Sequence, residues 1–486
     1  MRRSWGAVSM GAMSVALANR LEVLRSYPRF RPETIERFAR FIETAPEEAL
    51  FRTSPLHFAA DQGVPENEAV DLFLRATHAG ILEFTWGVLC PGCASFLTTP
   101  AALRSIQRTR DCQMCRFTVE REDDNMEVAF TVAPTVRRLR FHQPETLDLR
   151  RDLLPLMFSQ SRIVPDEVRR LVTDSVLDTL TLPAGGLQRF TVRMEVGQTY
   201  FLAAPLHHLW CQLEATPEGK VSAVDAELMD GRMLPDAIDV REGEVSVTLH
   251  NRTAAAARVA LVKFWVPRSA RACAATPLPP RPLRRYFSGK QLVTHQTFRE
   301  LFRAESIPSE GGLEFKSMTV LFSDLKGSTE LYERIGDLRA YGLVREHFGV
   351  LRDIIAERGG SMVKTIGDAV MASFAEPTPA LEAATAMTRE VRQLGRDGAK
   401  LQLKVGVHTG PCIAVELNER LDYFGQTVNV AARVQGVASA DEIAITEPVY
   451  TAPGSQDIIR AAALSATRER ALLKGVEGET TVYRLR

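Results

Sequence analysis

Thr319–Thr329, with the sequence T-V-L-F-S-D-L-K-G-S-T, leaves this chain few choices of fold. The apolar run Val320–Phe322 has the length and character of a buried strand, and it delivers Asp324 to the end of that strand. Lys326–Thr329 then forms a turn that opens a helix. A carboxylate at this position can hold a cation, while the free N–H groups of the helix hold phosphate oxygens. Many α/β domains place an aspartate there only for capping, so this stretch alone leaves both interpretations open.

Two later stretches supply further polar side chains. Gly367 and Asp368 form a tight hairpin turn between two short apolar strands, where Asp368 can join Asp324 around one or two cations. Asn429 and Arg433 lie four residues apart on a predicted helix, so they share one helix face. Paired acids with an Arg–Asn face are typical of phosphoryl-type chemistry, because metals neutralise the phosphates and arginine meets charge that builds in the transition state.

With these motifs, residues 315–486 resemble the catalytic domain of class III nucleotidyl cyclases, which make cyclic AMP or cyclic GMP. The resemblance implies a ferredoxin-like α+β fold, and the expected order of elements, β-α-β-β-α-β, fits that fold. Many members carry Lys-Gly-Lys near the C-terminus, where a lysine reaches the triphosphate. This chain departs from that pattern, because it has Lys474-Gly475-Val476 there.

The resemblance also assigns roles to individual residues. The metal ligands that it implies are Asp324, Leu325 and Asp368. The substrate-binding residues that it implies are Lys364 and Asp422, which read the adenine edge, together with Lys326, Gly327, Ser328 and Thr329. The catalytic residues that it implies are Asn429, which orients the ribose, and Arg433, which stabilises the transition state.

The function implied by this resemblance is that of an adenylate cyclase, which converts ATP to 3′,5′-cyclic AMP and pyrophosphate with Mg²⁺ or Mn²⁺. Its sites would lie between the protomers of a homodimer, with the metal aspartates from one protomer and the base-reading and catalytic residues from the other. Because the reaction uses cytosolic ATP, we expect a cytoplasmic protein. Two alternatives are a catalytically weak nucleotide or signal sensor, and a DNA-binding regulator with an attached cyclase.

The length and charge of the chain indicate a multidomain α+β protein without a global attraction to nucleic acid. It has 486 residues, with 60 basic and 60 acidic side chains. We find no stretch that approaches the ~20 apolar residues of a membrane span. Residues 1–31 begin with a weak apolar run that superficially resembles a signal peptide, but we expect them to be disordered.

Residues 32–84 predict a helical, winged-helix-like unit. Ile35, Phe38 and Ile42 recur at helical spacing, and two shorter helices should follow. The last of these helices, over 66–79, is not basic, whereas a DNA-reading helix needs Lys and Arg. We therefore favour a unit that packs against protein and consider nucleic acid an improbable partner.

Residues 85–120 predict a structural zinc ribbon. Two Cys-x-x-Cys pairs, with intervening spacing typical of such ribbons, supply four thiolates for tetrahedral zinc without an open position: Cys90, Cys93, Cys112 and Cys115. Two disulfides or a redox pair are the alternatives, which a cytosolic location disfavours.

Residues 121–270 predict a β-rich module, because several stretches alternate apolar and polar side chains, and this suggests a sandwich or a small barrel. Residues 271–314 predict a proline-rich linker followed by a short transmission helix, in which Thr297 and Glu300 fit a capping box. That helix could dock on the C-terminal domain or pair across a dimer. We expect residues 1–300 to receive a regulatory ligand or protein that the sequence does not identify.

Overall fold

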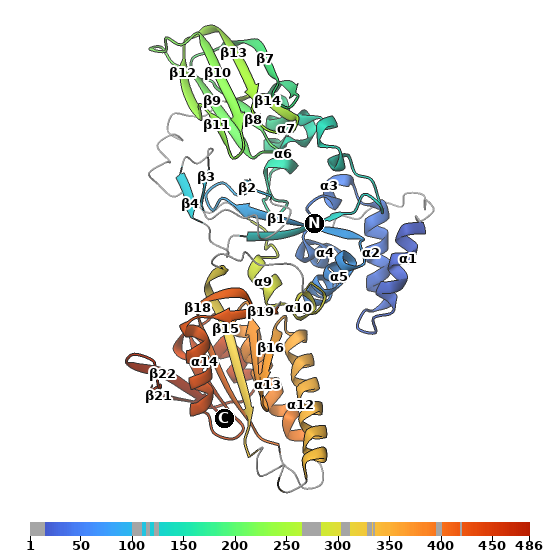
Figure 1. Cartoon of the computed structure of the whole chain (residues 1–486), viewed down its shortest axis with the longest axis vertical. Coiled ribbons are helices and arrows are strands. Elements are labelled where there is room, and N and C mark those ends of the chain that lie inside the picture. Colours follow the sequence, from blue (N-terminus) through green and yellow to red (C-terminus); the bar gives the residue numbers. More distant parts are fainter. Residues whose placement is uncertain are drawn as a thin grey trace.

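The structure is a computed structural model that describes residues 15–99, 109–112, 117–120, 126–264, 283–302, 312–327, 333, 336–394, 401–417 and 420–486. Figure 1 shows three parts along the longest axis of the molecule, with a β-sandwich at one end, a helical unit in the middle and the C-terminal domain at the other end. Within the described residues, we find no helix with both the length and the apolar character that a membrane span requires.

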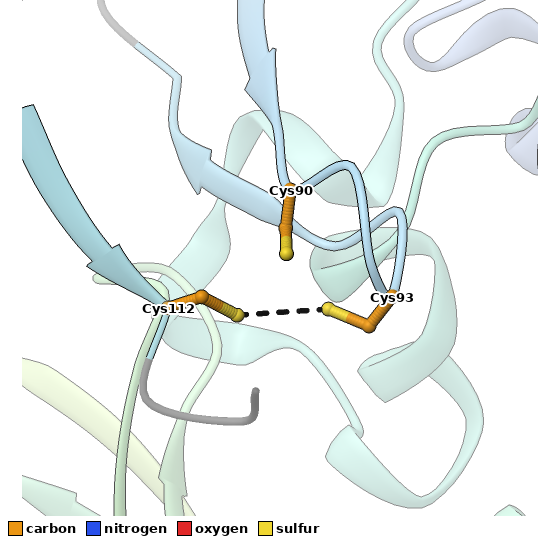
Figure 2. Close-up of side chains that lie close together, drawn as sticks. All are labelled: Cys90, Cys93 and Cys112. Carbon is orange, nitrogen blue, oxygen red and sulfur yellow. Dashed lines mark hydrogen bonds between the residues drawn. The ribbon is translucent and has the colours of Figure 1, made fainter. Parts of the chain in front are cut away.

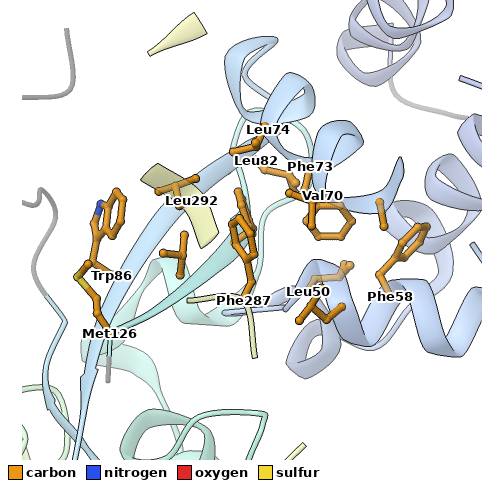
Figure 3. Close-up of a cluster of buried hydrophobic side chains, with 14 of the residues drawn as sticks. Leu50, Phe58, Val70, Phe73, Leu74, Leu82, Trp86, Met126, Phe287 and Leu292 are labelled. Atoms are coloured by element: carbon orange, nitrogen blue, oxygen red, sulfur yellow. The ribbon is translucent and has the colours of Figure 1, made fainter. Parts of the chain in front are cut away.

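The middle part begins with five helices around an aromatic core: α1 (Val15–Arg25), α2 (Pro32–Thr44), α3 (Glu47–Leu50), α4 (Pro55–Gln62) and α5 (Glu66–His78). Phe38, Phe58 and Phe73 meet there with ring centroids 5.3–5.9 Å apart (Figure 3 shows Phe58 and Phe73). Helix α1 differs from the disorder expected over residues 1–31. Its Leu17, Leu21 and Leu24 are spaced three and four residues apart and are buried, so packing orders this segment.

A small antiparallel sheet, in the order β2-β1-β5, follows the helices: β1 (Leu82–Leu89), β2 (Phe96–Thr98) and β5 (Met126–Val132). A second pair of strands, β3 (Thr109–Cys112) and β4 (Phe117–Glu120), lies in the sequence between β2 and β5. An isolated bridge joins Thr53, just before α4, to Phe130 of β5. Phe73 of α5 also packs against Phe130, with ring centroids 5.4 Å apart, so the helices and this sheet form one packed unit.

The predicted β-rich region is interrupted by helices. It contains the short helices η3 (Arg140–His142) and η4 (Pro144–Thr146) and the helices α6 (Leu149–Met157) and α7 (Asp166–Ser175). The sequence did not predict α6, because Pro155 within it disfavours a helix. Its Leu149, Leu153 and Leu156 are nevertheless buried in the apolar core.

The remaining strands form a two-sheet sandwich: β6 (Val176–Leu182), β7 (Leu187–Met194), β8 (Thr199–Ala204), β9 (Leu209–Ala215), β10 (Ala223–Met229), β11 (Arg232–Leu234), β12 (Ala237–Val240), β13 (Gly243–Asn251) and β14 (Ala257–Phe264). One sheet has the order β11-β10-β13-β7 and the other the order β12-β9-β8-β14-β6. Alternate side chains of both sheets meet in a separate apolar core, so the module is a sandwich rather than a barrel.

Residues 283–302, which we call the connector, join the middle part to the C-terminal domain through α9 (Gly289–Val293) and α10 (Gln296–Leu301). Ser288 and Gln291 form a capping box at α9. The capping box predicted for Thr297 and Glu300 is wrong. Helix α10 starts after His295 without a side-chain cap, so Thr297 lies inside the helix, where its hydroxyl donates to Asp71 of α5.

The C-terminal domain contains β15 (Leu313–Leu325), α12 (Asp337–Glu357), β16 (Ser361–Ile366), β17 (Ala369–Phe374), α13 (Pro377–Leu394), β18 (Leu403–Leu417), β19 (Arg420–Phe424), α14 (Gln426–Val437), β20 (Glu442–Thr446), α15 (Glu447–Tyr450), α16 (Ser455–Ala461), β21 (Ala466–Leu472) and β22 (Glu479–Leu485). Its sheet has the order β16-β17-β15-β18-β20-β22-β21, with β19 paired to β18. The first four strands and two helices follow the order β-α-β-β-α-β, which confirms the ferredoxin-like fold.

The apolar core of the middle part continues through the connector into the C-terminal domain. One cluster of buried side chains includes Phe130 of β5, Phe287 and Phe298 of the connector, and Phe322 and Tyr423 of the C-terminal domain. Figure 3 shows Phe287 and Leu292 of the connector among side chains of the helical unit. The connector is therefore a packed element that shares the cores of both neighbours.

Candidate active site

Two carboxylates lie close together at one end of the C-terminal sheet. Asp324 follows Ser323, which pairs with Val370 of β17. Asp368 lies two residues before Val370, in the turn between β16 and β17. Burial raises the pKa of Asp324 above its ordinary value, and the charge of Asp368 raises it further, while Lys404 opposes the shift. Two adjacent acids that repel each other suit a divalent cation, which relieves the repulsion.

The donor set around these acids fits a hard cation. Oδ2 of Asp368 is buried and has no hydrogen-bond partner among the described residues, so it is an oxygen with an open coordination position. Leu325, whose side chain is 3% exposed, can offer only its main-chain carbonyl. Oxygen ligands of this kind are those that Mg²⁺ and Mn²⁺ prefer.

Only the first part of the predicted phosphate-binding turn lies within the residues that the structure describes. Lys326 and Gly327 are exposed just beyond β15, and Gly327 has a φ of 76°, a conformation that glycine adopts without strain. The amide of Lys326 donates to the carbonyl of Gln402 at 2.8 Å, which fixes the start of the turn. Ser328 and Thr329 lie outside the described residues.

The predicted base-reading residues form an ion pair. Nζ of Lys364 on β16 lies 2.7 Å from Oδ2 of Asp422 on β19, and the side chains are 43% and 13% exposed respectively. The other carboxylate oxygen of Asp422 accepts the main-chain N–H of Tyr423 at 2.8 Å, which fixes the orientation of the carboxylate. The structure thus brings together a donor and an acceptor that are 58 residues apart in sequence.

The predicted catalytic residues Asn429 and Arg433 share the exposed face of α14. The opposite face of this helix buries Val430, Ala431 and Val434 against the sheet. The packing of α14 therefore fixes where the two polar side chains point, while leaving them accessible to a bound molecule or to a second protomer.

Three residues near these groups were not singled out from the sequence. Arg299 of the connector donates to the carbonyl of Leu421, and the hydroxyl of Tyr423 donates to the carbonyl of Val293 in the connector. His347 on α12 is fully buried, and burial lowers its pKa to about 4 while nearby Asp368 opposes the shift, so it is neutral at pH 7. Only the polar character of His347 within the apolar stripe of α12 could have pointed to it.

Three of the four predicted zinc ligands come together. The thiol groups of Cys90, Cys93 and Cys112 are buried, and their sulfur atoms all lie within 4.8 Å of one another (Figure 2). The sulfurs of Cys93 and Cys112 are 3.6 Å apart. Two thiolates bound tetrahedrally at ~2.3 Å from one zinc would be about 3.8 Å apart, so the cluster fits this metal. Cys115 lies outside the described residues.

Comparison with known proteins places these motifs in a family. A model described as "Adenylate and Guanylate cyclase catalytic domain" matches residues 313–486, which hold all the predicted metal-binding, base-reading and catalytic residues. Residues 313–486 of the chain are a class III adenylate/guanylate cyclase catalytic domain. A second model, described as "Family of unknown function (DUF5939)", matches residues 15–300, more than half of the chain, so the chain belongs to that family.

Relatives with assigned names include both types of cyclase. A pH-sensitive adenylate cyclase of Mycobacterium tuberculosis is 31% identical over 184 residues, which cover 38% of this chain and 43% of the relative. An adenylate cyclase of Anabaena cylindrica is 30% identical over 156 residues, which cover 29% of this chain and 31% of that relative. Guanylate cyclase 32E of Drosophila melanogaster is 29% identical over 150 residues, which cover 28% of this chain and 13% of that relative. The chain spans less than half the length of these curated relatives.

Among solved structures, the adenylyl cyclase CyaB from P. aeruginosa matches with 23% identity and a TM-score of 0.32. The match covers 35% of this chain and 94% of that protein.

Proposed function

We propose that this cyclase is an adenylate cyclase, which converts ATP to 3′,5′-cyclic AMP and pyrophosphate between the protomers of a homodimer. The observation that carries the choice of ATP is the ion pair of Lys364 with Asp422. An ammonium group can donate to N1 of adenine, and a carboxylate can accept from the exocyclic amine. Guanine presents the opposite groups at both positions, so its binding would leave polar groups unpaired, at about 1–3 kcal/mol each.

Asp324 and Asp368 would hold the divalent cations, with Leu325 offering its main-chain carbonyl. Mg²⁺ or Mn²⁺ bound there would lower the pKa of the ribose 3′-hydroxyl and neutralise the triphosphate. In the reaction, the 3′-oxygen forms a bond to the α-phosphorus as it loses its proton, and the bond from that phosphorus to the leaving pyrophosphate breaks.

The remaining residues position the substrate and stabilise charge. Lys326 and Gly327 stand at the start of the turn that would receive phosphate oxygens. Asn429 would orient the ribose. Arg433, exposed on the same face of α14, would meet the negative charge that builds on the α-phosphoryl group.

The exposure of Asn429 and Arg433 supports a site that two protomers share. These residues need a bound nucleotide and water exclusion to act, and a single chain leaves their helix face open. In a symmetric dimer, the α14 face of one protomer can cover the acid pair of its partner, which gives two composite sites.

We also propose that the cysteines bind structural zinc, with Cys115 as the fourth ligand. The supporting observation is the buried cluster of Cys90, Cys93 and Cys112. Four thiolates close the coordination sphere, so the ion would stabilise the ribbon without taking part in turnover.

Turnover of ATP and of GTP by the full chain, with Mg²⁺ and with Mn²⁺, tests the proposal. We expect cyclic AMP and pyrophosphate in equal amounts, and a higher kcat/KM for ATP than for GTP. A preference for GTP would refute the role of the Lys364–Asp422 pair. The absence of turnover of either nucleotide with either metal would refute the catalytic proposal itself.

A further inference from the structure

The base-reading pair joins two strands that do not hydrogen-bond to each other. Lys364 lies on β16, an edge strand that, among the described residues, pairs only with β17. Asp422 lies on β19, whose one partner strand within the described part of the chain is β18. The sheet ladder itself therefore does not set the distance between the two side chains.

Arg299 of the connector bridges these two strands. Its Nη2 donates to the carbonyl of Val363 at 3.2 Å and to the carbonyl of Leu421 at 2.7 Å. Val363 and Leu421 are the residues immediately before Lys364 and Asp422. The β16–β17 register shifts between Met362 and Lys364, so Val363 is the extra residue of a bulge, and its carbonyl is available to an outside donor.

Two neighbouring contacts attach the connector to the same strands. The main-chain N–H of Met362 on β16 donates to Oε1 of Gln296 at 2.9 Å. The buried hydroxyl of Tyr423 on β19 donates to the carbonyl of Val293 at 2.8 Å. Each base-reading strand thus has a hydrogen bond to Arg299 and a second one to another residue of the connector.

The other side of the connector is seated on the helical unit. The Thr297 hydroxyl donates to Asp71 of α5. The ring of Phe298, which is 4% exposed, lies 6.4 Å from that of Phe84 on β1, between centroids. Any shift of α5 or β1 would therefore move α10 and the guanidinium of Arg299 with it.

We propose that Arg299 is a positioning residue for base selection: it fixes the separation of β16 and β19, and so the geometry in which Lys364 and Asp422 meet the base. The proposal rests on the function proposed above. Because the helical unit contacts α10, the helix that carries Arg299, a movement of that unit would also change the preference for ATP over GTP.

The test compares the full-length Arg299→Gln and Arg299→Lys variants with an Arg285→Gln control. Arg285 belongs to the same connector, and its side chain is 71% exposed and ion-paired with Glu66. We expect Arg299→Gln to lower kcat/KM for ATP about tenfold, which corresponds to a loss of ~1.4 kcal/mol of transition-state stabilisation, with a much smaller effect on GTP. Arg299→Lys, which retains a cationic donor, should recover part of the ATP preference. Arg285→Gln should match the wild type.

Hydrogen–deuterium exchange gives a second readout that does not depend on turnover. Arg299→Gln should speed exchange in residues 361–366 and 420–424, and the control should not. Unchanged exchange in both strands would overturn the positioning role, whether or not the wild type is an adenylate cyclase. Faster exchange with equal losses for ATP and GTP would overturn the role in base selection. A wild type that prefers GTP would instead refute the proposed function and leave the exchange result to decide the positioning role.

Discussion

Asp324 and Asp368 repel each other when no cation lies between them, and the raised pKa of Asp324 reflects its burial and that repulsion. We expect Asp324→Asn to reduce cyclase activity at least about 100-fold, since charge stabilisation worth several kcal/mol is lost with the metal. Without added metal, the same variant should melt at the same temperature as the wild type or higher, because one of two like charges is gone. Steady-state turnover and thermal melting in chelator check both parts. A lower Tm in chelator would mean that Asp324 has a structural role instead.

Glu127 on β5 is a carboxyl group that the catalytic proposal does not use. Its side chain is 1% exposed, and its Oε1 accepts the Ser161 hydroxyl at 2.8 Å. Burial raises its pKa above the ordinary value, although hydrogen bonds from Ser159 and Ser161 and the charge of Arg52 oppose the shift. The folded state thus binds this proton more tightly than the unfolded state, so stability falls as pH rises from the ordinary carboxyl pKa through the raised one.

Glu127→Gln removes this titration. We expect the Tm of the variant, relative to the wild type, to increase as the pH is raised from 5 to 8. Melting curves across that range measure the difference, with Glu83→Gln as the control, since Glu83 is an exposed residue of the neighbouring strand β1. A difference that stays constant with pH would show that Glu127 does not titrate differently on folding.

Among the elements, the cysteine ribbon depends on an ion for its stability if the zinc proposal holds. Cys93→Ser should abolish zinc binding and lower the Tm of the full chain, because structural zinc contributes folding free energy directly. Elemental analysis of protein purified without chelator measures zinc per chain. Cys211→Ser is the matched control, because Cys211 is also buried but lies in the sandwich, and it should retain the metal. Wild-type protein without zinc would refute the ribbon.

Elements with one clear apolar stripe were predictable from sequence. Ile35, Phe38 and Ile42 indicated α2 because a surface helix buries residues at that spacing. The Lys364–Asp422 pair followed from a resemblance to a family, since no local pattern links residues that far apart. Arg299 was beyond prediction, because its partners are main-chain carbonyls, which every sequence offers at every position. The capping box at Thr297 failed for a related reason: the helix begins earlier, after His295, and the Thr297 hydroxyl makes a tertiary hydrogen bond to Asp71.

At the level of the assembled molecule, the shared site makes a prediction about mixtures. Asp324→Ala and Arg433→Ala should each be nearly inactive, since one donor to a transition-state charge is worth on the order of 10²–10³ in rate. In a heterodimer of the two variants, one site carries both defects and the other is intact. Activity should therefore return on mixing, toward about a quarter of wild type if subunits exchange freely and equally.

Native mass spectrometry of the mixture establishes whether heterodimers are present. A mixture with confirmed heterodimers that stays as inactive as its parents would mean that each site is built within one chain.

Because the connector packs against both of its neighbours, the position of a fusion joint decides which of its contacts a chimeric protein retains. A foreign sensor fused directly to residue 313 would inherit the catalytic groups without Arg299, and the buried hydroxyl of Tyr423 would lose its acceptor, Val293. A fusion at residue 283 would keep those bonds but expose Phe287 and Phe298, which are now 1% and 4% exposed. Such a sensor must therefore supply an apolar surface that buries these two rings. Without one, the hybrid exposes an apolar patch that favours aggregation.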